Sequence, residues 1–135
     1  MSKIEFIAEI SSNHNRDLNR CKKFIRRAYE IGCAGVKFQL FKIEELFAPE
    51  ILKYSKKHIS RKAWELPVEY IPILSDLAHS LNLSFSCTPF YLKAVDELET
   101  YVDFYKIASY EILWLDLFEK CGKTSKPIVF STGMA

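Results

Sequence analysis

The chain has 135 residues, of which 49% are apolar and 27% are charged, so it has the composition of one globular domain rather than a disordered segment. Nineteen basic and seventeen acidic residues give a formal net charge of +2, too close to balance to indicate nucleic acid or an anionic membrane as a partner. No apolar run approaches the roughly 20 residues of a membrane helix, and Glu5 stands where a signal peptide needs an apolar core, so we expect a soluble, cytoplasmic protein.

Short runs of β-branched and aromatic residues alternate with helical periodicities along the whole chain. In chain order we expect strand 5–11, helix 18–31, strand 35–40, helix 71–81, strand 84–88, helix 92–98, strand 104–109, helix 113–121 and strand 127–132. Asn15 or Asp17 is expected to cap the first helix and Gly32 to end it. Pro67 opens the second helix, or Pro72 kinks it or marks its true start.

One long connection, residues 41–66, is rich in charge and contains the most basic run of the chain, residues 53–62. We expect this run to be a mobile, solvated rim and not a nucleic-acid site, because few aromatic residues interleave with its basic ones. The four cysteines form no CxxC pair and are expected to be buried, reduced thiols, which argues against a zinc site.

Strands that alternate with helices predict an α/β fold with a parallel sheet and right-handed crossovers. Polar residues gather toward the carboxyl end of each predicted strand, where parallel sheets and barrels bind ligands. An open doubly wound sheet is the alternative, but no GxGxxG or GxxxxGK[ST] motif follows the first strand. We therefore expect part of a TIM-type (β/α) barrel, with about five strands and four helices.

Two lysines lie inside predicted strands, Lys37 in Val-Lys-Phe-Gln and Lys106 in Phe-Tyr-Lys-Ile. Strand alternation places Lys37 and Gln39 on one face, inside a barrel whose outer face packs on helices. A buried ammonium is costly unless it is paired, and Glu9 cannot neutralise both lysines. For either lysine taken alone, a structural ion pair is the simpler explanation. Together with hydroxyl groups at three strand ends, they predict a site for a small polyanion.

At this point five strand-end segments form a recognisable set. They are Ala-Glu-Ile with Asn-His-Asn (8–15), Val-Lys-Phe-Gln (36–39), Cys-Thr-Pro-Phe (87–90), Lys-Ile-Ala-Ser with Glu111 (106–111) and Ser-Thr-Gly-Met-Ala (131–135). In this order they resemble the strand-end motifs of the N-acetylneuraminate (sialic acid) synthase family, which includes synthases of legionaminic and pseudaminic acids. Each motif alone is weak, but the set covers nearly the whole chain.

The resemblance implies a (β/α)8 barrel that condenses phosphoenolpyruvate (PEP) with an open-chain N-acetylated hexosamine and releases phosphate. It also implies a divalent metal, Mn²⁺ or Mg²⁺, whose histidine ligands are expected beyond residue 135. The residues it assigns to PEP are Lys37, Thr88, Lys106, Ser109 and Ser131. Glu9 is implied as the acid or base, with Lys37 and Lys106 as the charges that stabilise the reaction. Gln39 and Glu111 are implied to face the sugar hydroxyls, and Asn13 and His14 are implied to line the mouth of the site.

The resemblance further implies that residues 1–135 are the N-terminal portion of the barrel. Three more βα units and a small C-terminal antifreeze-like domain, which completes the site of a neighbouring subunit in a homo-oligomer (dimer), are expected to lie outside this chain. Two residues depart from the family pattern. Arg16 stands where relatives often carry glycine after Asn-His-Asn, and Tyr110 occupies a variable position beside the sugar pocket.

Three other readings compete with a nonulosonic acid synthase. A non-catalytic half-barrel that binds an anion or assembles with a partner chain is one, and a basic surface binder using residues 53–62 is another. A different PEP-dependent synthase of 2-keto-3-deoxy acids is the third. The pairing of Asn-His-Asn at 13–15 with Ser-Thr-Gly-Met at 131–134 argues against that last reading.

Overall fold

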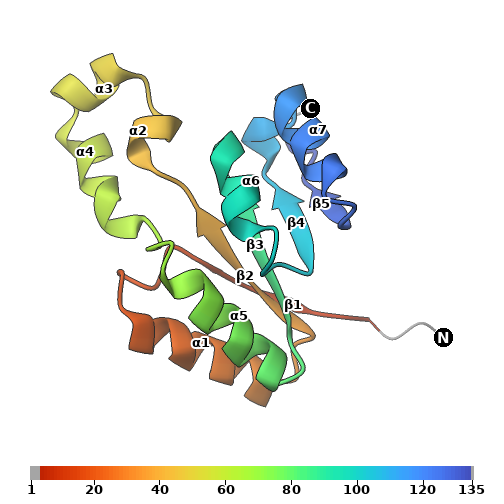
Figure 1. The fold of residues 1–135 in the computed structure, drawn as a ribbon. Coiled ribbons are helices and arrows are strands. Elements are labelled where there is room, and N and C mark those ends of the chain that lie inside the picture. The colour runs from red at the N-terminus through yellow and green to blue at the C-terminus, as the bar shows by residue number, and fades with distance from the viewer. Residues whose placement is uncertain (1–3, 135) are drawn as a thin grey trace.

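The structure is a computed structural model that describes residues 4–134, and its strands and helices alternate along the chain (Figure 1). The elements are β1 (Ile7–Ser11), α1 (Leu18–Glu30), β2 (Gly35–Leu40), α2 (Ile43–Leu46), α3 (Pro49–Tyr54), α4 (Lys56–Ile59), η1 (Ser60–Trp64), α5 (Tyr70–Ser80), β3 (Ser84–Pro89), α6 (Leu92–Leu98), β4 (Phe104–Ile107), η2 (Ser109–Glu111), α7 (Leu115–Lys123) and β5 (Ile128–Phe130). No helix among residues 4–134 is both long enough and apolar enough to cross a bilayer.

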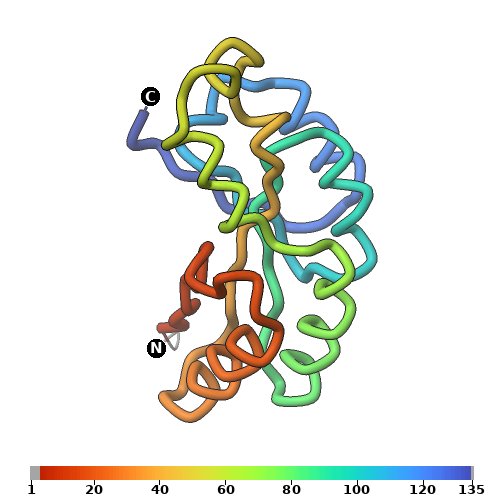
Figure 2. The backbone as a smooth tube through the Cα atoms, turned by 90° about the vertical axis from the view of Figure 1, so that its left-hand side faces the viewer, coloured from red at the N-terminus to blue at the C-terminus, as the bar shows by residue number. Residues whose placement is uncertain are grey.

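All four strand pairings are parallel, and the sheet order is β1-β2-β3-β4-β5. Each strand therefore pairs with the next one along the chain, as in the wall of a (β/α) barrel. This confirms the expected α/β fold with five parallel strands alternating with helices. Figure 2 shows α5 and α6 on the same side of the strands, so the helices cover one face of the sheet.

Side-chain alternation divides the strands as the sequence predicts. Val36, Phe38 and Leu40 of β2, with Phe85 of β3 and Tyr105 of β4, are fully buried on the helix-covered face. The residues that alternate with them point to the other face of the sheet and are polar or charged. On that face Lys37 is paired in register with Glu9 and Ser86, and Gln39 is paired with Thr88. The apolar face supplies the hydrophobic core, so the other face is free for polar chemistry.

The helix boundaries follow local signals. The Asp17 side chain caps α1 by accepting the backbone N–H of Arg20 at 3.0 Å, which decides between the two expected caps. Gly32 ends that helix at a φ of +80°, a conformation that side-chain-bearing residues rarely adopt. Pro72 lies in the first turn of α5, where its missing N–H has no intrahelical acceptor to lose.

The connection between β2 and α5 contains secondary structure that the sequence interpretation did not predict. Residues 42–66 fold into three short helices and a 3₁₀ turn, which together we call the lobe (Figure 1). Arg16 fastens the far end of the lobe to the β1–α1 loop, since its Nη1 donates to the carbonyl of Lys62 at 3.2 Å and lies 3.7 Å from the Glu65 carboxylate.

All four cysteines are free, and three of them are fully buried. Burial raises the pKa of the Cys21 and Cys121 thiols to about 11, and it raises the pKa of Cys87 further still. Thiols with such pKa values stay protonated near neutral pH and are poor nucleophiles and metal ligands. The expected burial therefore holds for Cys21, Cys87 and Cys121, whereas Cys33 is partly exposed.

Candidate active site at the carboxyl ends of the strands

An open cavity of about 1070 Å³ lies over the carboxyl ends of the strands. Nine of the ten residues predicted from the sequence line it: Glu9, Asn13, Lys37, Gln39, Thr88, Lys106, Ser109, Glu111 and Ser131. They come from all five βα units, so the parallel topology gathers side chains that are up to 122 positions apart. A concave site with several convergent polar groups is the usual form of a ligand pocket.

Lys37 is the most buried charge in the cavity, with 8% of its surface exposed. Its Nζ lies 2.5 Å from a carboxylate oxygen of Glu9 and donates to the hydroxyl of Thr88 at 2.9 Å. The second oxygen of Glu9 accepts the backbone N–H of Ser11 at 2.9 Å. These contacts fix the ammonium at the strand end, while half of the Glu9 side chain stays exposed to the cavity.

Lys106 differs from Lys37 because no carboxylate of residues 4–134 lies within 4.0 Å of its Nζ. It donates instead to the hydroxyl of Ser131 at 2.5 Å and to the carbonyl of Ile107 at 2.8 Å. Burial, with a smaller contribution from the nearby charge of Lys37, lowers the pKa of Lys106. Glu9 and Glu111 partly oppose this shift from a greater distance, but Lys106 has no ion-pair partner among residues 4–134, and an anion bound beside it would relieve that electrostatic cost.

The end of β1 is irregular, and the irregularity places further polar groups in the cavity. The pairing of β1 with β2 shifts register between Glu9 and Ser11, and Ser11 has a φ of +54°. Such a bulge re-aims side chains at a sheet end. The hydroxyl of Ser11 consequently donates to the Gln39 side-chain oxygen at 2.9 Å, and Ser12 donates to the same oxygen at 3.4 Å. The sequence interpretation did not include these two serines in the site.

Glu111 lies in the short turn η2 after β4, together with Ser109. Burial raises the pKa of the Glu111 carboxyl, and its Oε2 atom is buried without a hydrogen-bond partner among the described residues. An unpartnered buried carboxyl oxygen is free to accept a hydroxyl from a bound molecule. This geometry is compatible with the expected contact to a sugar hydroxyl.

His14 is the predicted residue that the structure places elsewhere. Its side chain is fully buried, packs against Phe38 on the helix-covered face with ring centroids 6.4 Å apart, and does not line the cavity. Its Nδ1 accepts the N–H of Arg16 at 3.0 Å. Burial, followed by the charge of Arg16, lowers the pKa of the imidazole. The structure thus places His14 among buried residues and not on the cavity wall, in a β1–α1 loop that passes through positive φ at Asn15 and Arg16.

The lobe contributes cavity residues that the sequence interpretation did not single out. Leu46, Phe47, Arg61 and Trp64 line the cavity from this side, together with Arg20 of α1. The basic run 53–62 is therefore not a uniformly solvated surface: Lys53, Lys56, Lys57 and Lys62 are exposed, whereas Arg61 is half-buried. Only the three-dimensional packing of the lobe distinguishes Arg61 from its neighbours.

A divalent metal has no ligand set in this part of the chain. No group of three His, Cys, Asp or Glu side chains among residues 4–134 is arranged to hold a metal ion. Glu9 is committed to Lys37, and His14 is buried away from the cavity. The described residues do not fit such an ion, and we assign no chemical step to one.

The fold and the cavity define a parallel (β/α)-barrel portion with cationic and polar side chains gathered at its strand ends. The family model named NeuB matches residues 24–135, and the chain belongs to the NeuB family. This confirms the resemblance derived from the sequence motifs.

Named relatives agree with this assignment. The chain is 36% identical to the pseudaminic acid synthase of Helicobacter pylori, over 97% of this chain and 42% of that protein. It is 38% identical to the N,N'-diacetyllegionaminic acid synthase of Campylobacter jejuni, over 100% of this chain and 44% of that protein. The chain thus spans less than half the length of these relatives.

Solved structures support the same fold. The N-acetylneuraminic acid synthetase of Leptospira borgpetersenii superposes with a TM-score of 0.89 at 27% identity, over 99% of this chain and 46% of that one. A truncated 3-deoxy-D-arabino-heptulosonate 7-phosphate synthase from Thermotoga maritima superposes with a TM-score of 0.67 at 14% identity, which shows a shared fold alone.

Proposed function

We propose that this chain forms the PEP-binding part of a synthase that condenses PEP with an N-acylated amino sugar to give a nonulosonic acid and phosphate. The observation that carries the proposal is Lys106, which has no ion-pair partner among residues 4–134 and is hydrogen-bonded to Ser131 beside the Lys37–Glu9 pair. Membership of the NeuB family and the names of the relatives support the same class of reaction.

PEP is a compact anion with a phosphate and a carboxylate, and the cavity offers two ammonium groups for it. Lys106 and Ser131 form one cluster of donors, and Lys37 and Thr88 form the other. Ser109 lines the cavity beside them. We assign these five residues to the two acidic groups of PEP. Donors that are already positioned stabilise charge in the transition state without reorganising when the reaction occurs.

In the condensation, C3 of PEP forms a bond to the aldehyde carbon of the sugar, whose oxygen takes up a proton. Water then adds to C2, and the bond between C2 and the phosphate oxygen breaks to release phosphate and leave the keto acid. Glu9 is half-exposed in the cavity and held by Lys37, so we propose it as the acid or base near the reacting carbons. Gln39, Glu111 and Asn13 would contact the sugar.

The direct test measures phosphate release from PEP with N-acetylated hexosamines, using the protein expressed from its own gene. We expect release that requires both substrates and is lost in Lys106→Met. PEP binding without phosphate release with any of the acceptor sugars would favour the alternative of a non-catalytic, anion-binding half-barrel. Absence of PEP binding would refute both.

A further inference from the structure

The backbone at Arg16 adopts a conformation that is uncommon for an arginine. Its φ is +56°, and that of Asn15 before it is +51°. Left-handed φ angles are rare outside glycine, asparagine and aspartate, and an arginine keeps one only where its surroundings hold it. The N–H of Arg16 donates to Nδ1 of the buried His14 at 3.0 Å, and its carbonyl accepts the hydroxyl of Tyr70 at 3.0 Å. These two contacts hold the strained backbone, and the Arg16 side chain is left to contact the lobe.

The side chain of Arg16 meets the lobe where the two ends of the lobe are joined. Glu65 joins them, because its Oε1 accepts the backbone N–H of Ile43 at 2.8 Å. The other carboxylate oxygen of Glu65 lies 3.7 Å from Nη1 of Arg16, and the same Nη1 donates to the carbonyl of Lys62 at 3.2 Å. We call these two contacts of Arg16, to Glu65 and to the Lys62 carbonyl, the clasp. The Glu65 side chain is largely buried, so water screens the pair only in part.

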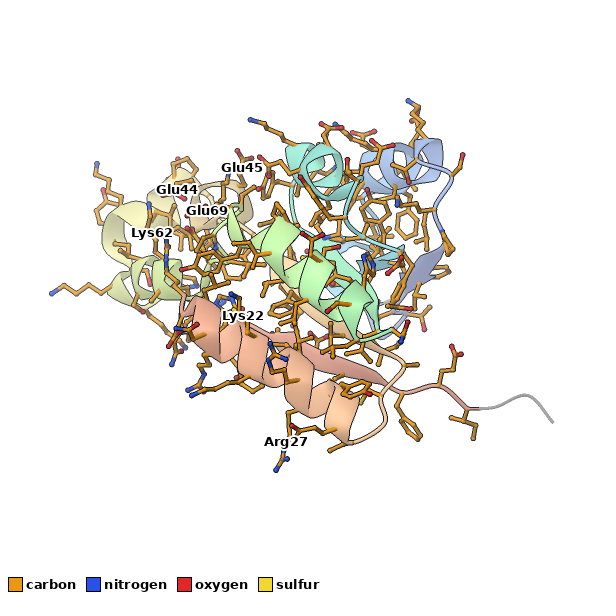
Figure 3. The ribbon with its side chains drawn as sticks, turned by 60° about the horizontal axis from the view of Figure 1, so that its bottom comes forward. Lys22, Arg27, Glu44, Glu45, Lys62 and Glu69 are labelled. Carbon is orange, nitrogen blue, oxygen red and sulfur yellow. The ribbon has the colours of Figure 1, made fainter. Side chains whose placement is uncertain are left out.

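The other charges of the lobe do not duplicate the clasp. Lys62 pairs with Glu44 inside the lobe at 2.6 Å, as the labelled side chains in Figure 3 show. Lys42, at the start of the lobe, lies 4.0 Å from Glu97 of α6. Among residues 4–134, the clasp therefore contains the one ion pair that joins the lobe to the β1–α1 loop.

The lobe forms one wall of the open cavity, whereas Arg16 does not line it. Figure 1 shows the lobe on the opposite side of the strand ends from β4 and β5. The ammonium and hydroxyl groups assigned to PEP lie on the strands or shortly after them. A movement of the lobe therefore changes the width of the cavity without moving those donors, and Arg16 can affect a bound molecule only through the lobe.

We propose that Arg16 is a positioning residue, whose clasp holds the lobe at the distance from the strand ends at which the cavity binds the acceptor sugar beside PEP. This inference rests on the proposed condensation and adds to it a residue that touches neither substrate. Molecules with the lobe attached are the ones that bind the sugar, so the apparent affinity for the sugar falls with the fraction attached. The affinity for PEP does not depend on the clasp.

Hydrogen exchange of the lobe tests the clasp without any measurement of activity. The ligand-free protein, expressed from its own gene, is compared with Arg16→Met, which removes the guanidinium. Exchange in residues 42–66 should become about 3- to 10-fold faster, the factor expected for one hydrogen bond and a partly exposed ion pair. Arg16→Lys keeps the charge and should recover part of the protection. Arg27→Met is the matched control, because it removes the exposed Arg27–Glu30 pair at the end of α1 that lies away from the lobe (Figure 3).

Phosphate release from PEP with N-acetylated hexosamines gives the kinetic readout. Arg16→Met should raise the KM for the sugar, by up to the factor seen in hydrogen exchange, and leave the KM for PEP and the Tm unchanged. A merely structural role would lower the Tm and would not separate the two KM values. Arg27→Met should change neither KM.

Lobe exchange as slow in Arg16→Met as in the parent would overturn the clasp. Faster exchange with an unchanged KM for the sugar would overturn the positioning role and leave the condensation standing. If the parent releases no phosphate with any of the hexosamines, the condensation fails, and titration with N-acetylmannosamine replaces the KM: weaker binding by Arg16→Met, together with faster exchange, would keep the clasp. If Arg16→Met does not fold, Glu65→Gln removes the same ion pair, retains an acceptor for Ile43, and should reproduce both effects.

Discussion

Replacing Lys106 with methionine should weaken PEP binding without destabilising the protein. Lys106 has no carboxylate partner within 4.0 Å among residues 4–134, so an anion in the cavity is the counter-charge that this ammonium lacks. Removing one member of a desolvated charge pair costs about 2–5 kcal/mol. Because Lys106 is half-buried, we expect the lower end of this range, about 2–3 kcal/mol, which is roughly a 30- to 140-fold rise in Kd.

The stability of the same variant provides a second readout. Burial lowers the pKa of Lys106, which means that the folded state disfavours its charged form. Removing the charge relieves this penalty and offsets the lost hydrogen bonds to Ser131 and Ile107, so the Tm of Lys106→Met should not fall. The lowered pKa also predicts that PEP affinity weakens as the pH rises through it, since the ammonium loses its proton below the ordinary lysine range. Lys106→Met should lack this alkaline loss.

Isothermal titration with PEP and thermal unfolding test both expectations. Lys126→Met is the matched control, because its Nζ donates to the carbonyl of Val102 at 2.6 Å and it does not line the cavity. PEP binding by Lys106→Met as tight as that of the parent would remove Lys106 from the anion site. A large drop in Tm would show that Lys106 is a structural residue after all.

Glu9→Gln should lower turnover strongly, because it removes the proposed acid or base. PEP affinity should stay equal or improve, because the change removes a negative charge from the proposed anion site. Normal phosphate release in this variant would exclude Glu9 from the chemistry. Burial raises the pKa of Glu111, so its ionised form disfavours folding. Glu111→Gln should therefore raise the Tm at neutral pH and lose this advantage in acid. A Tm difference between variant and parent that does not depend on pH would contradict that reasoning. Gly35→Ala should cost about 1–3 kcal/mol in chemical unfolding, because its Cβ would lie 2.8 Å from the backbone oxygen of Ser84; an unchanged midpoint would show that β2 and β3 can separate freely.

The alternation of strands and helices was predictable because each element has a strong local signal. The inward direction of Lys37 and Gln39 followed from strand alternation alone, and parallel strands necessarily bring their carboxyl ends together. Side-chain period and strand-end polarity pointed to seven of the nine cavity residues: Glu9, Lys37, Gln39, Thr88, Lys106, Ser109 and Ser131. Asn13 and Glu111 were implied only by the resemblance to the family.

The misplaced and missed residues depend on features that have no such period. The position of His14 is set by positive φ angles in the β1–α1 loop, which the sequence does not specify for Asn15 and Arg16. Arg61 is selected from its basic neighbours by the rings of Phe47 and Trp64, which approach it only once the lobe has folded. Loop geometry therefore sets the position of His14, and side-chain packing between segments without periodicity sets that of Arg61.

The consecutive order of the strands has a consequence for how the chain acquires its structure. Because every strand pairs with the preceding strand of the chain, each new βα unit can dock on a surface that already exists. Paired residues are nevertheless 18 to 49 positions apart, so each pairing must first offset the entropy of closing a long loop, and we expect parallel pairing to be a slow step. Such a chain can form its structure in the order of its synthesis, with Lys37 in place before Lys106 emerges from the ribosome.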